Sequence, residues 1–215
     1  MILNNNMYPW LSYGFGILIY LWWIWKKLSS KPTPETKSIV ILGSKGAGKT
    51  TLWNGLQGKM NPTNYESTGE EEIKSFVFES DSGKEIMIQN TRDYGGDDIW
   101  VEYYENLIKE GTFIYYLIDL CRLEETKKEV RARLVKIEQI IKDKKYNNCG
   151  LKILATNLKK SNLNENEVPG KIKECLGFNS LKKKIQNIKI DDRIMPVELT
   201  NNDYIKKIRD EIAGV

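Results

Sequence analysis

The sequence predicts an α/β fold built on a mainly parallel six-stranded sheet, with one antiparallel edge strand and helices on both faces. Short apolar strands and amphipathic helices alternate along residues 38–212, which is typical of parallel sheets with helical crossovers. A glycine-rich segment, Gly43–Thr50, lies between the first strand and the first helix. An uncharged aromatic stretch, residues 8–25, precedes the domain.

The expected elements follow one another with short connections. Strands are expected at residues 38–42, 73–79, 85–89, 112–120, 150–155 and 193–199. Helices are expected from the end of the glycine segment to about residue 57, and at residues 99–110, 124–144, 165–176 and 203–212. Because a polar turn at residues 81–84 joins the second and third strands as a hairpin, this pair supplies the antiparallel edge.

Composition excludes several classes of function. The chain has 215 residues, which suits one globular domain, and its net charge of +4 is spread over mixed Lys/Glu helices. Such a weak, dispersed charge argues against nucleic acid as a partner. There is no histidine, so catalysis by histidine and metal binding through histidine are both excluded. The three cysteines, Cys121, Cys149 and Cys175, lie too far apart for a zinc motif, and we expect reduced thiols.

Residues 8–25 allow three interpretations. A cleaved signal peptide would carry positive charge before its apolar run, whereas here Lys26, Lys27 and Lys31 follow it. A buried core helix is disfavoured by the terminal position and the many aromatic residues. A single membrane anchor fits best, because the stretch continued to Leu28 provides the roughly 20 residues that cross a bilayer, and Trp and Tyr lie at both ends.

These observations divide the chain into three parts. Residues 1–28 form the expected transmembrane anchor, residues 29–37 a tether with Pro32 and Pro34, and residues 38–215 the globular domain. The lysines that follow the apolar stretch predict a single-pass membrane protein whose domain lies in the cytoplasm.

Gly43–Thr50 has the spacing of a phosphate-binding loop: Gly, four residues, then Gly-Lys-Thr. Glycines let successive backbone N–H groups point at a phosphate chain, and the following helix adds its positive end. Lys49 is expected to reach the β- and γ-phosphates, and Thr50 to ligate Mg²⁺. The nucleotide-binding residues expected here are Gly43, Ser44, Lys45, Gly46, Ala47, Gly48, Lys49, Thr50 and Thr51.

With this loop at the head of alternating strands and helices, residues 38–212 resemble the G domain of the Ras superfamily of small GTPases. The pattern is most similar to the Arf-like branch and to the β subunit of the signal-recognition-particle receptor, which also has one N-terminal membrane span. The resemblance implies GTP and GDP as ligands, Mg²⁺ as cofactor and switch loops that respond to the γ-phosphate.

The resemblance implies a threonine after the first helix that ligates Mg²⁺. Arf-like proteins carry Thr-x-Gly there, and Ser67–Gly69 lies at a suitable separation from Thr50. Thr68 is therefore the expected ligand, with Thr63 as the alternative.

A third motif, Asp-x-x-Gly, is expected after the third strand. Asp93–Gly96 fits it, which makes Asp93 a magnesium residue and Gly96 a γ-phosphate contact by resemblance. In a rival register Asn90, which directly follows the strand, takes the place of the aspartate. The register at Asp93 is preferred because it preserves both motif residues.

Two residues beside this motif are catalytic candidates. Many family members place a glutamine after the motif to orient water, whereas this chain has Asp97. A carboxylate beside the γ-phosphate is repelled electrostatically, so slow intrinsic hydrolysis is expected. Arg92 is a candidate for an arginine contact to phosphate, with an ordinary surface arginine as the alternative.

The motif that reads the base departs from the family. Members use Asn-Lys-x-Asp, in which Asn contacts guanine N7 and Asp accepts from the N1–H and the exocyclic amine. Here Asn157 matches, but Leu158 replaces the lysine and Lys160 the aspartate. Because an ammonium group accepts no hydrogen bond, guanine specificity is in doubt.

Other residues were candidates for the base site. Asp191 or Asp192 could replace the missing acceptor, although nothing in the sequence brings them there. The fifth family motif is weakly recognisable at residues 199–201.

Two functions remain. The first is a membrane-anchored GTP-binding switch with slow hydrolysis that recruits a cytosolic protein partner, and whose other partners are guanine nucleotide and the lipid bilayer. The second is a non-hydrolysing pseudo-GTPase that serves as a membrane docking platform. A P-loop kinase of small molecules fits poorly, since no arginine-rich lid is visible.

Overall fold

The computed structural model describes residues 20–25, 33–59, 69–186, 189–190 and 194–214. The chain divides into two compact units, Met1–Thr33 and Pro34–Val215. In the first unit, residues 20–25 are helical. The rest of the expected membrane span, residues 8–19, lies outside the described residues, and within the described ones no helix is long and apolar enough to cross a bilayer.

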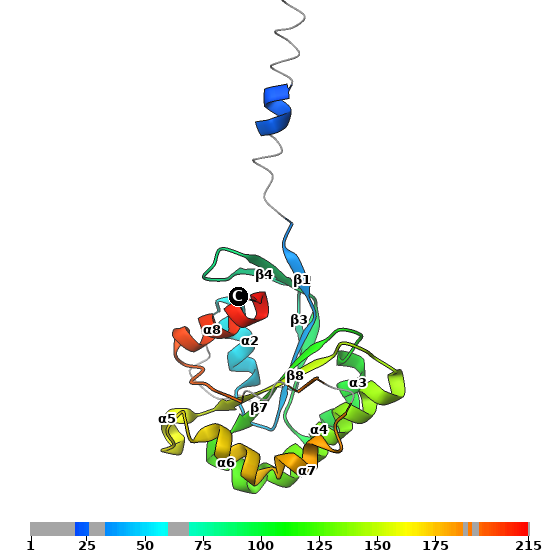
Figure 1. The fold of residues 1–215 in the computed structure, drawn as a ribbon, viewed down its shortest axis with the longest axis vertical. Helices are drawn as coiled ribbons and strands as arrows, with labels where there is room; N and C mark the ends of the chain where they lie inside the picture. Colours follow the sequence, from blue (N-terminus) through cyan, green and yellow to red (C-terminus); the bar gives the residue numbers. More distant parts are fainter. Residues whose placement is uncertain (1–19, 26–32, 60–68, 187–188, 191–193, 215) are drawn as a thin grey trace, which may run out of the picture. The chain divides into compact units, whose positions relative to one another are not determined.

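The second unit contains the α/β fold predicted from the sequence, confirmed as a parallel sheet covered by helices (Figure 1). Its central strands pair in the order β10-β8-β7-β2, all parallel. Their bounds are β2 (Ile39–Gly43), β7 (Phe113–Asp119), β8 (Gly150–Thr156) and β10 (Met195–Pro196). β2 and β8 are buried along their whole length, as expected for strands covered on both faces.

The expected last strand, 193–199, is much shorter than predicted. A two-residue strand, β9 (Lys189–Ile190), pairs with the start of β8, and β10 pairs with its end. Pro196 lies in β10 and has no N–H to donate, and proline is tolerated in sheets only at edges.

The remaining strands form two further sheets, of three and of two strands, in place of the single antiparallel edge of a six-stranded sheet that the sequence predicted. β1 (Glu35–Lys37) runs parallel to β5 (Glu85–Ile88), and β5 pairs antiparallel with β4 (Phe76–Glu79). β3 (Glu70–Ile73) pairs antiparallel with β6 (Thr91–Tyr94). The expected loop after residue 89 is therefore strand, because residues 91–94 find backbone partners in β3.

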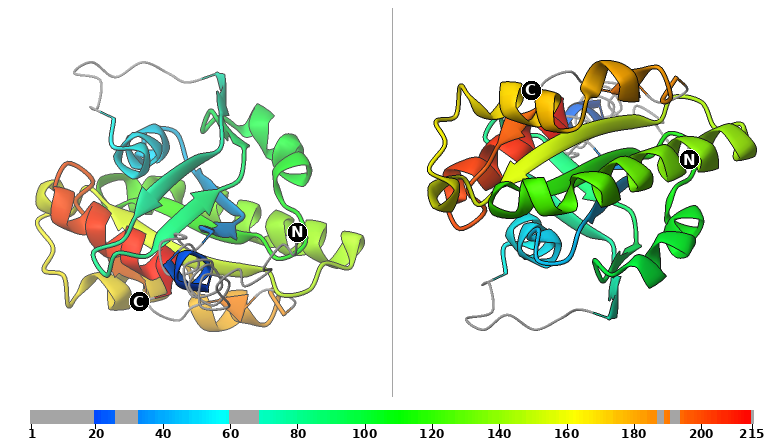
Figure 2. Two further views of the ribbon diagram at one scale, coloured as in Figure 1. Left: turned by 90° about the horizontal axis from the view of Figure 1, so that it is seen from above. Right: turned by 90° about the horizontal axis from the view of Figure 1, so that it is seen from below.

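Helices cover both faces of the sheet (Figure 2). α2 (Lys49–Gln57) and α8 (Asn202–Ala213) lie side by side on one face, with a core that includes Trp53, Leu117 and Ile208. The opposite face packs against α4 (Leu123–Lys144), α6 (Val168–Cys175) and α7 (Phe178–Lys182). Short helices also lie between these elements, among them η2 (Leu120–Arg122), α5 (Leu158–Ser161) and α3 (Tyr104–Leu107).

The helix expected at 99–110 is only partly α-helical. It begins as a 3₁₀ helix, η1 (Asp98–Tyr103), and continues as the four-residue α3. Trp100 and Tyr103 both pack on Tyr94, with ring centroids 5.2 and 5.7 Å from the Tyr94 ring. Residues three apart share a face of a 3₁₀ helix, so this aromatic cluster accounts for the tighter winding.

The parallel strands bring their carboxyl ends to one edge of the sheet. β2 ends at Gly43, β7 at Asp119 and β8 at Thr156. In open α/β sheets, ligands bind outside these ends. The glycine segment and Asn157, which are far apart in sequence, therefore meet at this edge.

Candidate nucleotide-binding site

The loop from Gly43 to Thr50 leads from β2 into α2. Gly46 and Gly48 have φ of 76° and 94°, a left-handed conformation that side chains rarely adopt. A β-carbon at Gly48 would also lie 2.7 Å from Leu199 Cδ1. Gly48 is the N-cap of α2, so the N–H groups of the first helical turn open toward the loop.

Lys49 lies inside this loop rather than in solvent. Its Nζ donates to the carbonyl oxygens of Gly43, at 3.2 Å, and Ser44, at 3.3 Å. Burial lowers the Lys49 pKa to about 8, although the Asp93 carboxylate acts in the opposite direction. A buried cation within reach of these loop atoms is suited to pair with phosphate oxygens.

The carboxyl end of β6 reaches the same place. Thr50 Oγ1 donates to Asp93 Oδ2 at 2.6 Å, and Asp93 is fully buried. Burial raises the Asp93 pKa, while the Thr50 hydrogen bond and Lys49 oppose the rise. Asn90, the rival residue, is exposed and lines a separate cavity, so the structure brings Asp93 and not Asn90 to the loop.

Thr50 and Asp93 fit the magnesium ion that the family implies. Asp93 Oδ1 is buried and has no hydrogen-bond partner within the described part of the chain. Hydroxyl and carboxylate oxygens are the hard ligands that Mg²⁺ takes, usually few from the protein. Among the described residues, no group of three or more His, Cys, Asp or Glu side chains could hold a metal ion.

Gly96 lies directly against the loop. A β-carbon at Gly96 would lie 2.1 Å from Lys45 N and 2.4 Å from the Ser44 carbonyl carbon, so no larger residue fits without movement. The next residue, Asp97, accepts from Lys45 Nζ at 3.3 Å in a partly exposed ion pair. Both candidates are therefore next to the phosphate loop.

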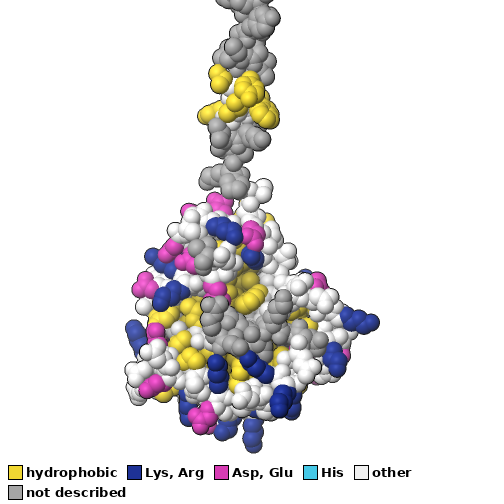
Figure 3. Space-filling model, viewed as in Figure 1, with side chains coloured by type: hydrophobic (Ala, Val, Ile, Leu, Met, Phe, Trp, Pro, Cys, Tyr) yellow, Lys and Arg dark blue, Asp and Glu magenta, His cyan; other side chains and the backbone are white. Residues whose placement is uncertain are grey.

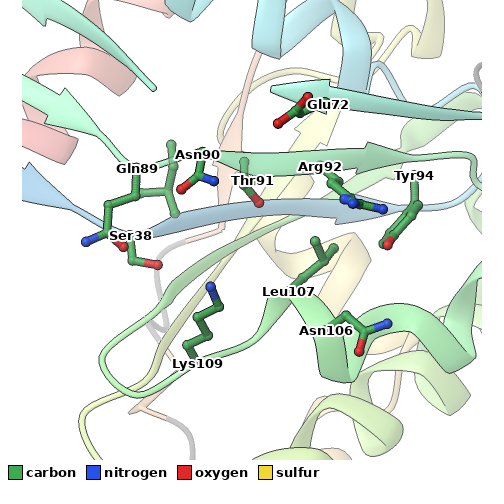
Figure 4. Close-up of a pocket in the computed structure, with 11 residues that line it drawn as sticks. Ser38, Glu72, Gln89, Asn90, Thr91, Arg92, Tyr94, Asn106, Leu107 and Lys109 are labelled. Atoms are coloured by element: carbon green, nitrogen blue, oxygen red, sulfur yellow. The ribbon is translucent and has the colours of Figure 1, made fainter. Parts of the chain in front are cut away.

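Arg92 is not brought to the loop. Successive residues of a strand point to opposite faces, so Arg92 points away when Asp93 points in. It pairs with Glu70 on β3 and lines a cavity of about 340 Å³, together with Asn106 and Lys109 (Figure 4). The structure gives it no contact with the phosphate loop within the described residues.

Asn157 is held beside the loop by its neighbours. The Thr156 hydroxyl donates to the carbonyl oxygen of Ala47 at 2.9 Å, which ties the end of β8 to the loop. Asn157 itself has φ of 60° and caps α5. The expected ligand Thr68, its alternative Thr63, and Asp191 and Asp192 lie outside the described residues.

The nearest described neighbour of Thr68 is Gly69. Gly95 N donates to the Gly69 carbonyl oxygen at 2.8 Å, so the start of β3 lies beside the Asp93–Gly96 segment.

Sequence reasoning missed Arg133 on α4, which is 3% exposed. Its guanidinium donates to the carbonyl oxygens of Gly43, at 3.4 Å, and Gly96, at 2.9 Å. It also pairs with Asp98 and Glu129, each at 2.8 Å. The sequence could have indicated this role, because Arg133 lies on the apolar stripe of a Lys/Glu helix. A charged side chain at such a buried position needs a hydrogen-bond or ion-pair partner.

Sequence reasoning also missed Glu198, an acidic residue that follows β10 and is 8% exposed. Its Oε2 accepts from the backbone N–H of Lys159 at 3.3 Å, and its Oε1 from the Thr200 hydroxyl at 3.0 Å. A carboxylate within an otherwise apolar segment was the signal. The fifth motif expected at 199–201 thus begins one residue after Glu198, whose side chain contacts the base loop, the segment Thr156–Lys160 that carries the base motif.

Taken together, the glycine loop, its internal lysine and the Thr50–Asp93 pair define a P-loop nucleotide-binding domain. Residues 24–209 match the ADP-ribosylation factor (Arf) family, and the chain belongs to that family of small GTPases. Its members are GTP-binding switches and, in general, GTP hydrolases, and guanine nucleotide binding is typical of them. No curated protein shows a significant match to the chain.

Solved structures share the fold. The Arl6 BBS3 small GTPase from Trypanosoma brucei, with bound GppNp, has a TM-score of 0.56 and 15% identity over 83% of this chain and 96% of its own. Methanosarcina barkeri Roco2 RocCORdC, bound to GDP, has a TM-score of 0.52 and 18% identity over 88% of this chain and 54% of its own.

A variant of SsGBP has a TM-score of 0.54 and 15% identity over 94% of this chain and 60% of its own. The chain thus spans about half the length of the Roco2 structure and somewhat more of the SsGBP one. At these identities the likeness concerns the fold.

The depressed Lys49 pKa predicts a pH dependence of nucleotide binding. In the phosphate-free protein the Lys49 ammonium is lost as pH rises through about 8, and the anion favours the protonated form. The dissociation constant for Mg–GTP should therefore be flat below pH 8 and rise by up to about tenfold per pH unit above it. Titration calorimetry between about pH 7 and 9 measures it. Lys49→Met is the control and should give weak, pH-independent binding; an equally flat wild-type profile contradicts the prediction.

Arg133 predicts a large loss of stability on substitution. Arg133→Met leaves the Gly43 and Gly96 carbonyl oxygens without this donor and Glu129 without its partner. Leaving buried carbonyl groups without their donor costs about 1–3 kcal/mol. The urea midpoint should fall accordingly, whereas Lys136→Met, at an exposed position of the same helix, should change it little. Equal midpoints for the two variants would show that Arg133 does not hold these segments together.

Proposed function

We propose that this Arf-family protein is a membrane-anchored GTP-binding switch with slow intrinsic hydrolysis, which recruits a cytosolic protein partner. The observation that carries the proposal is the 2.6 Å hydrogen bond between Thr50 and Asp93 at the P-loop, with the second Asp93 oxygen buried and unpartnered within the described residues. These are the groups that a magnesium–triphosphate complex requires.

The proposed roles follow from position. Lys49 binds the β- and γ-phosphates, with the backbone N–H groups of residues 44–51 around the phosphate chain. Thr50 and Asp93 hold Mg²⁺, which neutralises phosphate charge when bound, and Thr68 is the further ligand that the family resemblance implies. Gly96 presents its backbone to the γ-phosphate, since it already lies against Ser44 and Lys45.

Slow hydrolysis is supported by Asp97. Its side chain is partly exposed beside Lys45 and occupies the position of the water-orienting glutamine of related proteins. A carboxylate both repels the γ-phosphate charge and lacks the donor with which a glutamine amide orients water. We therefore expect hydrolysis to need a partner protein.

Membrane anchoring is supported by residues 8–25. The part that the structure describes, residues 20–25, is helical and exposes large apolar side chains. They are Tyr20, Leu21, Trp22, Trp23 and Trp25. Figure 3 shows the described part of this segment as a yellow, hydrophobic surface. Aromatic side chains of this kind favour the membrane interface, and the lysines that follow favour a cytoplasmic domain. Over the face of the domain visible in Figure 3, basic and acidic side chains are interspersed, which disfavours nucleic acid.

Partner recruitment is supported by the surface that follows Gly96. Ile99 and Tyr103 on η1 are 69% and 46% exposed, which is unusual for large apolar residues. Because η1 directly follows the proposed γ-phosphate contact, a change at the phosphate would move or order this surface.

The alternative is a non-hydrolysing platform that keeps its nucleotide. It is favoured by the same Lys45–Asp97 pair, which occupies the catalytic position with a salt bridge and no water-orienting amide. The two functions differ in turnover and in the need for nucleotide exchange.

Nucleotide binding and turnover test the proposal. The purified full-length protein should bind Mg–GTP, and Lys49→Ala should weaken binding by about 100-fold or more because a charged hydrogen bond is lost. Lys59→Ala, an exposed lysine just after α2, is the matched control and should leave binding unchanged. Single-turnover hydrolysis should be about 10⁻² s⁻¹ or slower, and Asp97→Gln should raise it.

Three outcomes separate the possibilities. Tight binding without turnover in the wild type and in Asp97→Gln favours the platform. Fast wild-type turnover contradicts the slow switch. Binding that survives Lys49→Ala removes the P-loop role altogether.

Membrane anchoring makes a separate prediction. The full-length protein should float with liposomes and resist extraction by carbonate, since a spanning helix is held by its buried apolar area. A form that begins at residue 34, the start of the second compact unit, should remain in the aqueous fraction. Flotation of both forms, or of neither, would contradict an anchor at residues 8–25.

A further inference from the structure

The base loop lacks an acceptor where related proteins carry one. Lys160 stands at the position of the family aspartate and is exposed. Guanine presents two adjacent donors on that edge, the N1–H and the exocyclic amine, and an ammonium group cannot accept from either. A site that left both donors unpaired would lose most of its discrimination between bases.

A buried carboxylate from the segment after β10 lies beside this loop. Val197 N donates to the Ala155 carbonyl oxygen at 2.7 Å, which sets residues 197–198 alongside the end of β8. The Glu198 carboxylate then accepts from the backbone N–H of Lys159, inside the base loop, at 3.3 Å. We propose that Glu198 supplies the acceptor that position 160 lacks and makes the site selective for guanine, an inference that rests on the nucleotide-binding function proposed above.

The same segment contacts the phosphate loop. Leu199 lies so close to Gly48 that a β-carbon there would be 2.7 Å from its Cδ1, and Thr156, just before Asn157, donates to Ala47. Glu198 is therefore one residue away from a side chain that contacts the phosphate loop.

The Glu198 carboxylate is held in place and still has capacity to accept. One oxygen accepts from Lys159 N and the other from the Thr200 hydroxyl, at 3.0 Å. A carboxylate offers about four lone-pair positions, so each oxygen keeps one for a base donor. Two neighbouring oxygens match the two neighbouring donors of guanine, in the manner of a bidentate pair.

The surroundings of Cys121 are consistent with this convergence. Its Sγ lies 3.9 Å from the Asn157 carbonyl oxygen. Burial is the main cause that raises the Cys121 pKa; Asp119 and Glu198 add to the rise, and Lys160 opposes it. Asp119 at the end of β7, Asn157 just after β8 and Glu198 just after β10 thus lie near the same cysteine.

Adenine is the competing base. Its amine could also donate to Glu198, but its N1 would then need a donor in place. Lys160 is exposed, and no contact within the described residues fixes its ammonium against the site. The fixed carboxylate matches two donors better than one donor and one acceptor, which favours guanine.

The test compares four nucleotides on the full-length protein, as magnesium complexes, by titration calorimetry. Wild type should bind GTP about 10- to 100-fold more tightly than inosine triphosphate, which lacks the amine and so one charged hydrogen bond. Xanthosine triphosphate, with a carbonyl in place of the amine, and ATP should bind more weakly still.

Glu198→Gln replaces an acceptor oxygen with a donor. This variant should bind GTP about 10- to 100-fold more weakly than wild type does. It should bind xanthosine triphosphate more tightly, because the carbonyl of that base accepts a hydrogen bond from the glutamine amide. Glu174→Gln, at an exposed position of α6, is the control and should change neither. The wild-type comparison with inosine triphosphate needs no variant, so the proposal stays testable if Glu198→Gln fails to fold.

Several results would overturn the role of Glu198: equal wild-type affinity for GTP and inosine triphosphate, tighter binding of ATP than GTP, or an unchanged preference in folded Glu198→Gln. If these occur while Lys49→Ala still abolishes binding, the phosphate site stands and only the base assignment fails. If wild type binds no nucleotide, both fail.

Discussion

The hydrogen bond between Thr50 and Asp93 joins the two segments on which the site depends. Thr50 is the second residue of α2 and Asp93 the next-to-last residue of β6, so this contact joins the helix after the phosphate loop to a strand that lies beside β2. Three residues after Asp93, Gly96 lies against the backbone of the phosphate loop at Ser44 and Lys45. Arg133 then reinforces the arrangement from α4 by donating to carbonyl oxygens of both segments.

Buried charge explains why these contacts are arranged as they are. Lys49, Asp93 and Arg133 are each at most 8% exposed, and isolated charges in that position would be costly. Each is therefore met by oxygens or by an opposite charge, and the remaining Asp93 oxygen and the low Lys49 pKa mark the places where the balance is incomplete. A magnesium–phosphate group would complete it, since it brings both a cation for Asp93 and an anion for Lys49.

The site divides between two parts of the sheet. The phosphate end is built on β2 and β6, whose termini lie next to the loop, while the proposed base end lies where β7, β8 and β10 finish. The proposed exchange of an acceptor from position 160 to Glu198 is possible because parallel strands end at one edge, so that neighbouring strands can supply the same group. A departure from a family motif in one loop then need not change what the site recognises.

The sequence by itself determined the α/β fold and the phosphate loop, because both rest on local patterns: alternating apolar segments, and glycines with Lys49 and Thr50 in consecutive positions. Tertiary structure alone separated Asp93 from Asn90, turned Arg92 away from the loop, and revealed Arg133 and Glu198. Each of these depends on which face of a strand or helix meets another segment 22 or more positions away, as with Arg92 and Glu70 or Lys159 and Glu198. Such pairings carry no signal in local spacing, and they are fixed only when strands align and a buried polar group must find its partner.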